Sequence, residues 1–244
     1  MRSLSRLLTP RSALFLDFDG TLTDIAPRPD AVVIDDALPG LLTQLHQRLG
    51  GALAVVTGRA QADIEPMLAP LRASLPAAYE HGAVRRNANQ VLTVAPPPAL
   101  DRALAAAQSL ADQHPGLIVE RKRGSVALHF RLAPALASTC VAAMTEVARL
   151  GAGLQLLHGK AVVEVKSAQV GKDLAVEAFM AEAPFAGRRP VFVGDDVTDE
   201  PAFIAVQRLG GDGVKVGHGE TAAAHRIESP ARLRQWLQDS LQSL

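Results

Sequence analysis

Apolar and polar positions follow one repeating pattern over both ends of the chain. Short continuous apolar runs occupy residues 13–16, 52–56 and 190–194, which is typical of strands buried on both faces. Leucines at helical spacing predict an amphipathic helix over residues 36–49, between the first two runs. Because strand, helix and strand in this order are typical of parallel βαβ units, we expect an α/β core with a parallel sheet.

The middle of the chain has a different pattern. It predicts two helices, each followed by a pair of strands: 100–113 with 117–122 and 125–131, then 134–150 with 154–157 and 161–166. That order indicates an α+β layer, with helices on one side of a mostly antiparallel sheet. Three consecutive prolines at 96–98 indicate an extended connector. We therefore expect an inserted domain at 98–169 and a core formed by 1–97 and 170–244.

Composition narrows the class of protein. The 244 residues are 48% hydrophobic and 20% charged, a balance typical of a globular protein. Lys+Arg and Asp+Glu are both 25, which argues against a nucleic-acid partner held by bulk charge. A single cysteine, Cys140, suits a reducing compartment. No apolar run approaches the ~18 residues of a membrane span. We expect a cytoplasmic protein with no membrane partner.

Two carboxylates follow the first buried strand directly. Asp17 and Asp19 stand two residues apart and are followed by Gly20. Ligands of parallel α/β sheets bind outside the carboxyl ends of the strands. A carboxylate in that place can accept a phosphoryl group, and the second can give or take the proton of the leaving group. The alternative is a solvated Asp-x-Asp-Gly turn without chemistry.

Two further strands end in polar residues. Thr57 and Arg59 follow the second strand. The hydroxyl of Thr57 can bind a phosphate oxygen, and the planar guanidinium of Arg59 can donate to anionic or polyol oxygens. The alternative role for Thr57 is to cap a helix that runs through residues 64 and 67. The third strand ends in four acids within residues 195–200. Like charges this close repel, and a divalent cation relieves the repulsion.

These strand ends resemble known motifs. Residues 17–22, 56–59 and 194–200 are similar to the first, second and fourth motifs of the haloacid-dehalogenase-like (HAD) phosphohydrolases. The resemblance implies that Asp17 is the nucleophile, Asp19 the general acid and base, and Thr57 a phosphoryl-binding residue. It also implies that Mg²⁺ is held by Asp17, the Asp19 carbonyl and Asp195. Asp196 and Asp199 would contact these ligands or the metal itself.

The third motif of that family is carried by Lys172, which the resemblance implies steadies the nucleophile and the phosphoryl group. By itself, a lysine that begins a helix after a glycine is an ordinary surface residue. Family members usually have glycine after this lysine, whereas this chain has Asp173. An aspartate there suits a helix N-terminus, but its charge can weaken phosphate binding or pair with Lys172.

The inserted segment resembles the C2B, or IIB, type of HAD cap. Within it, residues 119–122, 125–131 and 159–166 resemble cap signatures of the trehalose-6-phosphate phosphatases. The resemblance implies that the distal glucose is held by Glu120, Lys122 and Glu164. It suggests further sugar contacts from Arg131 and Lys160 in the cap, and from Arg59 and His81 in the core. The alternatives are a solvated hairpin face and, for His81, a structural histidine.

The implied activity is Mg²⁺-dependent hydrolysis of trehalose 6-phosphate through an aspartyl-phosphate. The implied partner is a small sugar phosphate, with functional coupling to a separate trehalose-phosphate synthase. Three rivals remain at this point: a phosphatase for another sugar phosphate such as sucrose phosphate, a phosphomutase on the same core, and a non-catalytic sugar-phosphate sensor.

Overall fold

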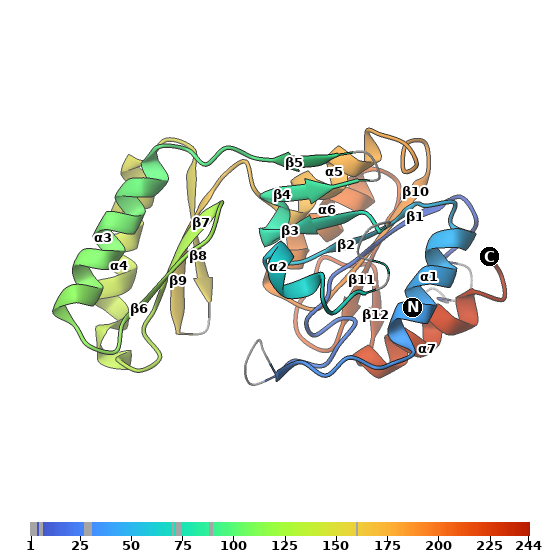
Figure 1. Cartoon of the computed structure of the whole chain (residues 1–244), viewed down its shortest axis with the longest axis horizontal. Coiled ribbons are helices and arrows are strands. Elements are labelled where there is room, and N and C mark those ends of the chain that lie inside the picture. The colour runs from blue at the N-terminus through green and yellow to red at the C-terminus, as the bar shows by residue number, and fades with distance from the viewer. Residues whose placement is uncertain are drawn as a thin grey trace. The chain divides into compact units, whose positions relative to one another are not determined.

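The computed structural model describes residues 4, 7–26, 31–69, 71, 75–87, 90–159 and 161–244 (Figure 1). Lys160 lies outside the described residues. The chain forms two compact units. We call Met1–Leu92 with Gly171–Leu244 the core unit, and Thr93–Val170 the cap unit. Within the described ranges, no helix is long and apolar enough to cross a membrane.

The core unit contains an eight-stranded sheet in the order β12-β11-β10-β1-β2-β3-β4-β5, whose last strand ends at Thr93, the first residue of the cap unit. Its strands are β1 (Ser12–Leu16), β2 (Leu53–Val56), β3 (Ala77–Tyr79), β4 (Val84–Arg86), β5 (Val91–Thr93), β10 (Arg189–Gly194), β11 (Asp212–Val216) and β12 (His225–Ile227). The strands from β12 to β3 pair in parallel, and β4 is antiparallel to β3. The predicted α/β core with a parallel sheet is therefore confirmed.

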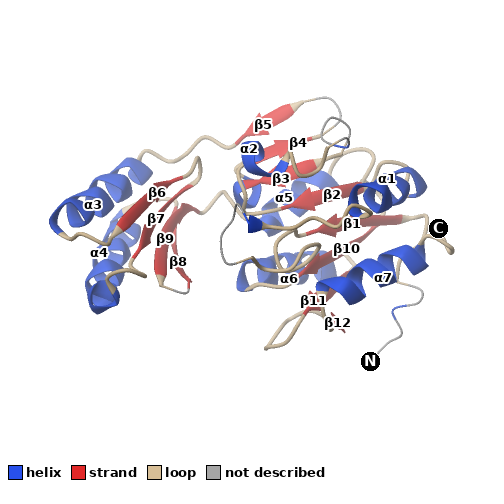
Figure 2. Ribbon diagram, turned by 60° about the horizontal axis from the view of Figure 1, so that its bottom comes forward, coloured by secondary structure: helices blue, strands red, loops and turns tan. Residues whose placement is uncertain are grey.

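Helices cover both faces of this sheet (Figure 2). The core unit has α1 (Leu38–Arg48), α2 (Gln61–Ile64), α5 (Lys172–Met180), α6 (Glu200–Arg208), α7 (Pro230–Ser240) and the short 3-10 turns η4 (Glu80–Gly82) and η6 (Val197–Asp199). Leu14 and Leu16 of β1 pack in one apolar cluster with α1 and α7. The alternating residues Ala13 and Phe15 pack in a second cluster with α5 and α6. Burial on both faces explains the continuous apolar run of β1.

The segment after Thr57 differs from the sequence-based expectation. The predicted helix through Met67 ends at Ile64. Pro66 has no main-chain N–H, so it cannot donate the next helical hydrogen bond, to the carbonyl of Ala62. The N-cap residue of this helix is Ala60, so the alternative role of Thr57 as its cap is wrong.

The cap unit contains a four-stranded antiparallel sheet in the order β6-β7-β9-β8. Its elements are α3 (Ala99–Gln113), β6 (Ile118–Arg121), β7 (Ser125–His129), the turn η5 (Pro134–Leu136), α4 (Ala137–Leu150), β8 (Leu154–Gly159) and β9 (Val162–Ser167). Alternate strand residues such as Val126, Leu128 and Val163 form one apolar cluster with α3 and α4. The predicted α+β layer is thus confirmed, and we call the opposite side the helix-free face of the cap sheet.

Candidate active site

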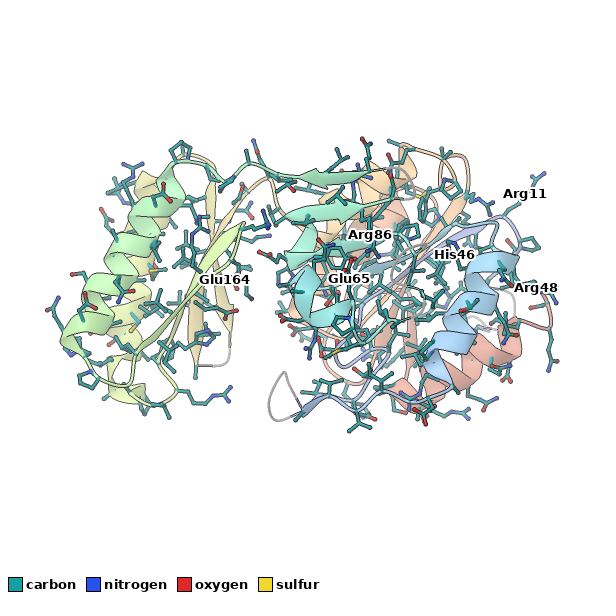
Figure 3. All side chains as sticks on the ribbon, viewed as in Figure 1. Arg11, His46, Arg48, Glu65, Arg86 and Glu164 are labelled. Atoms are coloured by element: carbon teal, nitrogen blue, oxygen red, sulfur yellow. The ribbon has the colours of Figure 1, made fainter. Side chains whose placement is uncertain are left out.

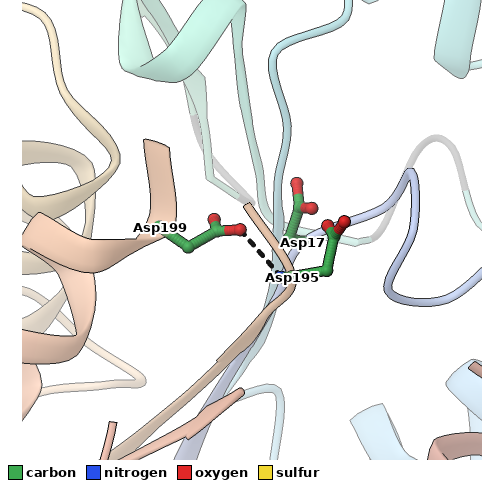
Figure 4. A group of neighbouring side chains, drawn as sticks. All are labelled: Asp17, Asp195 and Asp199. Atoms are coloured by element: carbon green, nitrogen blue, oxygen red, sulfur yellow. Dashed lines mark hydrogen bonds between the residues drawn. The ribbon is translucent and has the colours of Figure 1, made fainter. Parts of the chain in front are cut away.

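The ends of β1 and β10 bring two predicted metal ligands together. The strands are parallel neighbours, with Leu16 in register with Val193, so Asp17 and Asp195 emerge side by side. Asp199, from η6, completes the group (Figure 4). One carboxylate oxygen of each aspartate lies within 4.8 Å of the others. Three carboxylates from two segments of the chain therefore converge at the carboxyl edge of the sheet.

Lys172 joins this group from the first turn of α5. Its ammonium donates to Asp17 Oδ1 and to Asp199 Oδ1, both at 2.7 Å. The residue is only 4% exposed, so the alternative of an ordinary surface lysine is wrong. Burial lowers the pKa of Lys172, but the two carboxylates more than offset this effect and raise its pKa overall. The ammonium stays charged, with its ion pairs directed to these two aspartates.

The carboxylate cluster carries more negative charge than Lys172 balances. Burial raises the pKa of Asp17 well above its ordinary value, and the charge of Asp199 raises it further. Burial and Asp199 also raise the pKa of Asp195. Closely spaced carboxylate oxygens are the ligands that Mg²⁺ prefers. This donor set and its excess charge fit a divalent cation.

Asp199 has an additional task inside the cluster. Its Oδ2 accepts hydrogen bonds from the main-chain N–H groups of Asp195 and Asp196, both at 3.0 Å (Figure 4 marks the first). Asp196 is exposed, and its side chain caps η6 reciprocally with Asp199. Asp199 therefore holds the Asp195 loop in position while it pairs with Lys172.

Asp19 pairs with Arg59 and is not part of the group formed by Asp17, Asp195 and Asp199. The guanidinium forms a two-pronged ion pair, with Nε donating to Asp19 Oδ2 and Nη2 to Oδ1, each at 2.7 Å. Arg59 also lies against the Phe18 ring, 6.0 Å from its centroid. Both oxygens of Asp19 therefore accept charge-assisted hydrogen bonds from Arg59. The structure thus links Arg59, predicted as a sugar contact, to the predicted acid.

Thr57 and His81 are neighbours at the end of β2. Thr57 is buried, and its Oγ1 accepts a hydrogen bond from the N–H of Arg59 at 3.1 Å. The His81 N–H donates to the Thr57 carbonyl at 2.9 Å. The His81 ring lies against Gly58, where an added Cβ would be 2.6 Å from the ring. Gly58 is therefore needed for the close approach of this histidine.

Two residues that the sequence reasoning missed also hold the site together. Thr21 Oγ1 lies 3.2 Å from both Asp17 Oδ2 and Asp195 Oδ1, and it belongs to the first motif. Lys215 is 5% exposed and donates to the main-chain carbonyl of Asp195. The signal in the sequence was a lysine between two valines of a strand.

The predicted sugar contacts of the cap unit lie mainly on its helix-free face. Glu120 Oε2 is 3.0 Å from His129 Nε2, and Glu120 Oε1 is 3.6 Å from Lys122 Nζ. Glu164 lies on β9 (Figure 3), and its Oε1 is buried without a hydrogen-bond partner among the described residues. Arg131 follows β7 and is exposed.

Comparisons with known proteins decide the family. The family described as trehalose-phosphatase matches residues 15–235. The chain belongs to this family. This family member is 39% identical over 233 residues to the trehalose-6-phosphate phosphatase of Escherichia coli (strain K12), covering 95% of this chain and 87% of that protein. It is 42% identical over 207 residues to a probable trehalose-phosphate phosphatase of Sinorhizobium fredii (strain NBRC 101917 / NGR234), covering 84% and 77%.

Solved structures agree with the fold of this trehalose-phosphatase family member. The C-terminal domain of the Candida albicans trehalose-6-phosphate phosphatase matches with a TM-score of 0.80 at 22% identity, covering 97% of this chain and 93% of that chain. A haloacid-dehalogenase-like hydrolase from B. subtilis matches with a TM-score of 0.69 at 14% identity, covering 93% and 99%. These likenesses confirm the predicted HAD-like fold.

Proposed function

We propose that this protein hydrolyses trehalose 6-phosphate to trehalose and inorganic phosphate, with Mg²⁺ as cofactor and an aspartyl-phosphate on Asp17. The observation that carries the proposal is the buried group in which Lys172 joins Asp17 and Asp199. A phosphate monoester and a carboxylate nucleophile repel each other, so the site must supply positive charge. Mg²⁺, held by Asp17, the Asp19 carbonyl and Asp195, would supply further positive charge at the phosphoryl group when bound.

In the first step, an oxygen of Asp17 attacks phosphorus, and the bond to the sugar oxygen breaks. Lys172 and Thr21 each contact one oxygen of Asp17, which supports a fixed orientation of the carboxylate. We propose that the Thr57 hydroxyl donates to a phosphoryl oxygen. The leaving sugar oxygen takes a proton from Asp19, so trehalose departs as a neutral alcohol.

In the second step, Asp19 takes a proton from water, whose oxygen attacks phosphorus and releases phosphate from Asp17. Asp19 must therefore face the leaving oxygen in the first step, whereas both of its carboxylate oxygens accept hydrogen bonds from Arg59 in this structure. We infer that Arg59 exchanges this carboxylate for substrate oxygens when the ester binds. That exchange reconciles its observed pairing with the predicted sugar contact.

We propose that the cap unit recognises the distal glucose. Carboxylates accept hydrogen bonds from sugar hydroxyls, and lysine and arginine donate to them. Glu120, Lys122 and Glu164 are the main proposed contacts; Arg131, Lys160 and, from the core unit, His81 are further ones. The buried Oε1 of Glu164, which has no hydrogen-bond partner in the part of the chain that the structure describes, supports this role, because a buried carboxylate oxygen is costly unless a ligand donates to it.

The test is phosphate release with Mg²⁺ from trehalose 6-phosphate, glucose 6-phosphate and sucrose 6-phosphate, with Asp17→Asn as the inactive control. We expect a strong preference for the trehalose ester and no release by the variant. Better turnover of another ester would disprove the proposed specificity but keep the core mechanism. No release from any ester would favour a sugar-phosphate sensor.

We also propose that the enzyme works in the cytoplasm on the product of a separate trehalose-phosphate synthase. The only cysteine, Cys140, is a buried free thiol, which suits a reducing compartment. The measurement is a coupled assay, in which a synthase supplies the ester and this protein releases phosphate from it.

A further inference from the structure

The register of the cap sheet places one small residue between the two proposed sugar carboxylates. Ala127 of β7 is the cross-strand partner of Glu120 on β6 and of Glu164 on β9. All three residues therefore form one row across neighbouring strands. With strands 4.7–4.9 Å apart, the two glutamate backbones are separated by about 9–10 Å.

The side chain of Ala127 belongs to the same face as the two glutamates. Its neighbours Val126 and Leu128 are buried in the apolar cluster that includes α3 and α4. Because side chains alternate along a strand, Ala127 is on the helix-free face. It is 2% exposed, although no helix of the cap unit covers that face. An added side-chain atom would therefore have to displace a neighbouring group, and the nearest cross-strand positions are the two glutamates.

The two carboxylates on either side of Ala127 have different partners. Glu120 is oriented by His129 at 3.0 Å and by Lys122 at 3.6 Å. Glu164 has an oxygen that is buried and without a hydrogen-bond partner among the described residues. The carboxylate of Glu120 is thus already oriented by its neighbours. The Oε1 of Glu164 can accept a hydrogen bond from a donor such as a sugar hydroxyl.

We infer that Ala127 is a specificity-determining residue, whose small size sets the spacing of Glu120 and Glu164 around the distal sugar ring. The inference rests on the proposed function, because it assigns the ring to these carboxylates. A larger side chain at position 127 would rise between the glutamates and displace one or both. Esters without a distal sugar make no use of the row formed by Glu120, Ala127 and Glu164. Ala127 therefore affects substrate selectivity and not the phosphoryl chemistry.

The experiment compares Ala127→Ser, Ala127→Val and Ala127→Leu with the wild type on trehalose 6-phosphate and on p-nitrophenyl phosphate, which has no sugar. We expect kcat/KM for the trehalose ester to fall in the order Ser, Val, Leu. Ala127→Leu should lose about 100-fold, mainly through a higher KM, since misfit in a pocket costs 10–200-fold per misplaced methylene. Hydrolysis of p-nitrophenyl phosphate should stay within about twofold, which also reports a folded core.

Ala105→Leu is the matched control, because it makes the same substitution at an exposed alanine of α3 in the same unit. It should leave both esters unchanged. Ala127→Val keeps the test valid if leucine disturbs folding, because β-branched residues suit a strand.

An Ala127→Leu variant that keeps kcat/KM for the trehalose ester within about threefold would overturn the inference. Equal losses on both esters would overturn it as well, since the residue would then act on the fold. A wild type without preference for the trehalose ester would instead refute the proposed function.

Discussion

The charged side chains of the core and cap units differ in burial and in pairing. In the core unit, Asp17 and Lys172 are each 4% exposed, and Asp199 is fully buried, yet all three are joined by ion pairs. In the cap unit, the side chain of Glu120 is 47% exposed, while Glu164 has a buried oxygen with no hydrogen-bond partner within the described ranges. Buried charges are tolerated only when paired. The charged groups of the core site are therefore preorganised by their ion pairs. The helix-free face of the cap sheet has carboxylate oxygens that can accept hydrogen bonds from a ligand.

The comparison predicts that the largest loss follows from removing the central cation of the core. Lys172→Met should lower kcat by about 10³-fold, because it removes the fixed positive charge beside the nucleophile. It should also cost about 3 kcal/mol of stability, since two buried carboxylates lose their partner. Steady-state kinetics and denaturant unfolding measure the two effects. A kcat within tenfold of the wild type would contradict this role for Lys172.

The next effect concerns the residue that orders the Asp195 loop. Asp199→Asn should lower kcat by about 100-fold, because a shift of about 1 Å in Asp195, the proposed metal ligand, is costly. An amide can satisfy either the ammonium of Lys172 or the two main-chain N–H groups, but not both. Thermal stabilisation by Mg²⁺ should weaken in the same variant. Asp239→Asn on α7 is the control, because it makes the same substitution at an exposed aspartate that does not belong to the carboxylate group, and it should retain that stabilisation.

In the cap unit, we expect binding to change and chemistry to remain. Glu164→Gln should raise KM for trehalose 6-phosphate about 30-fold, with kcat within about threefold. Stability should not fall, because the replaced carboxylate oxygen has no partner among the described residues. Initial rates over a range of substrate concentrations separate KM from kcat. An equal fall in kcat would place Glu164 in the chemical step and remove the contrast between the units.

The smallest effect should come from the residue that orients Glu120. His129→Phe should raise KM for the trehalose ester by about threefold to tenfold. The hydrogen bond from His129 lowers the pKa of Glu120, so the ionised carboxylate persists to lower pH in the wild type. On acidification, KM of the variant should therefore begin to rise at a higher pH. Identical pH profiles of KM would show that His129 does not act through Glu120.

Part of the fold followed directly from local patterns. The continuous apolar run of β1 predicted a strand buried on both faces, and Leu14 and Phe15 do pack on opposite faces. The motif acids at the ends of β1 and β10 were predicted to converge, and parallel pairing of these strands brings Asp17 and Asp195 together. The predicted continuation of α2 through Met67 is wrong, because Pro66 has no main-chain N–H to continue the helical hydrogen bonds.

The sequence by itself determined which residues stand at strand ends, because an apolar run and the polar residue that ends it are local features of the sequence. Only the tertiary structure decided that Lys172 lies between Asp17 and Asp199, which are 155 and 27 positions away. The same holds for the bidentate ion pair of Arg59 with Asp19 and for the position of Ala127 between Glu120 and Glu164. Such contacts depend on sheet order and register, which many distant residues set together, so no local pattern contains them.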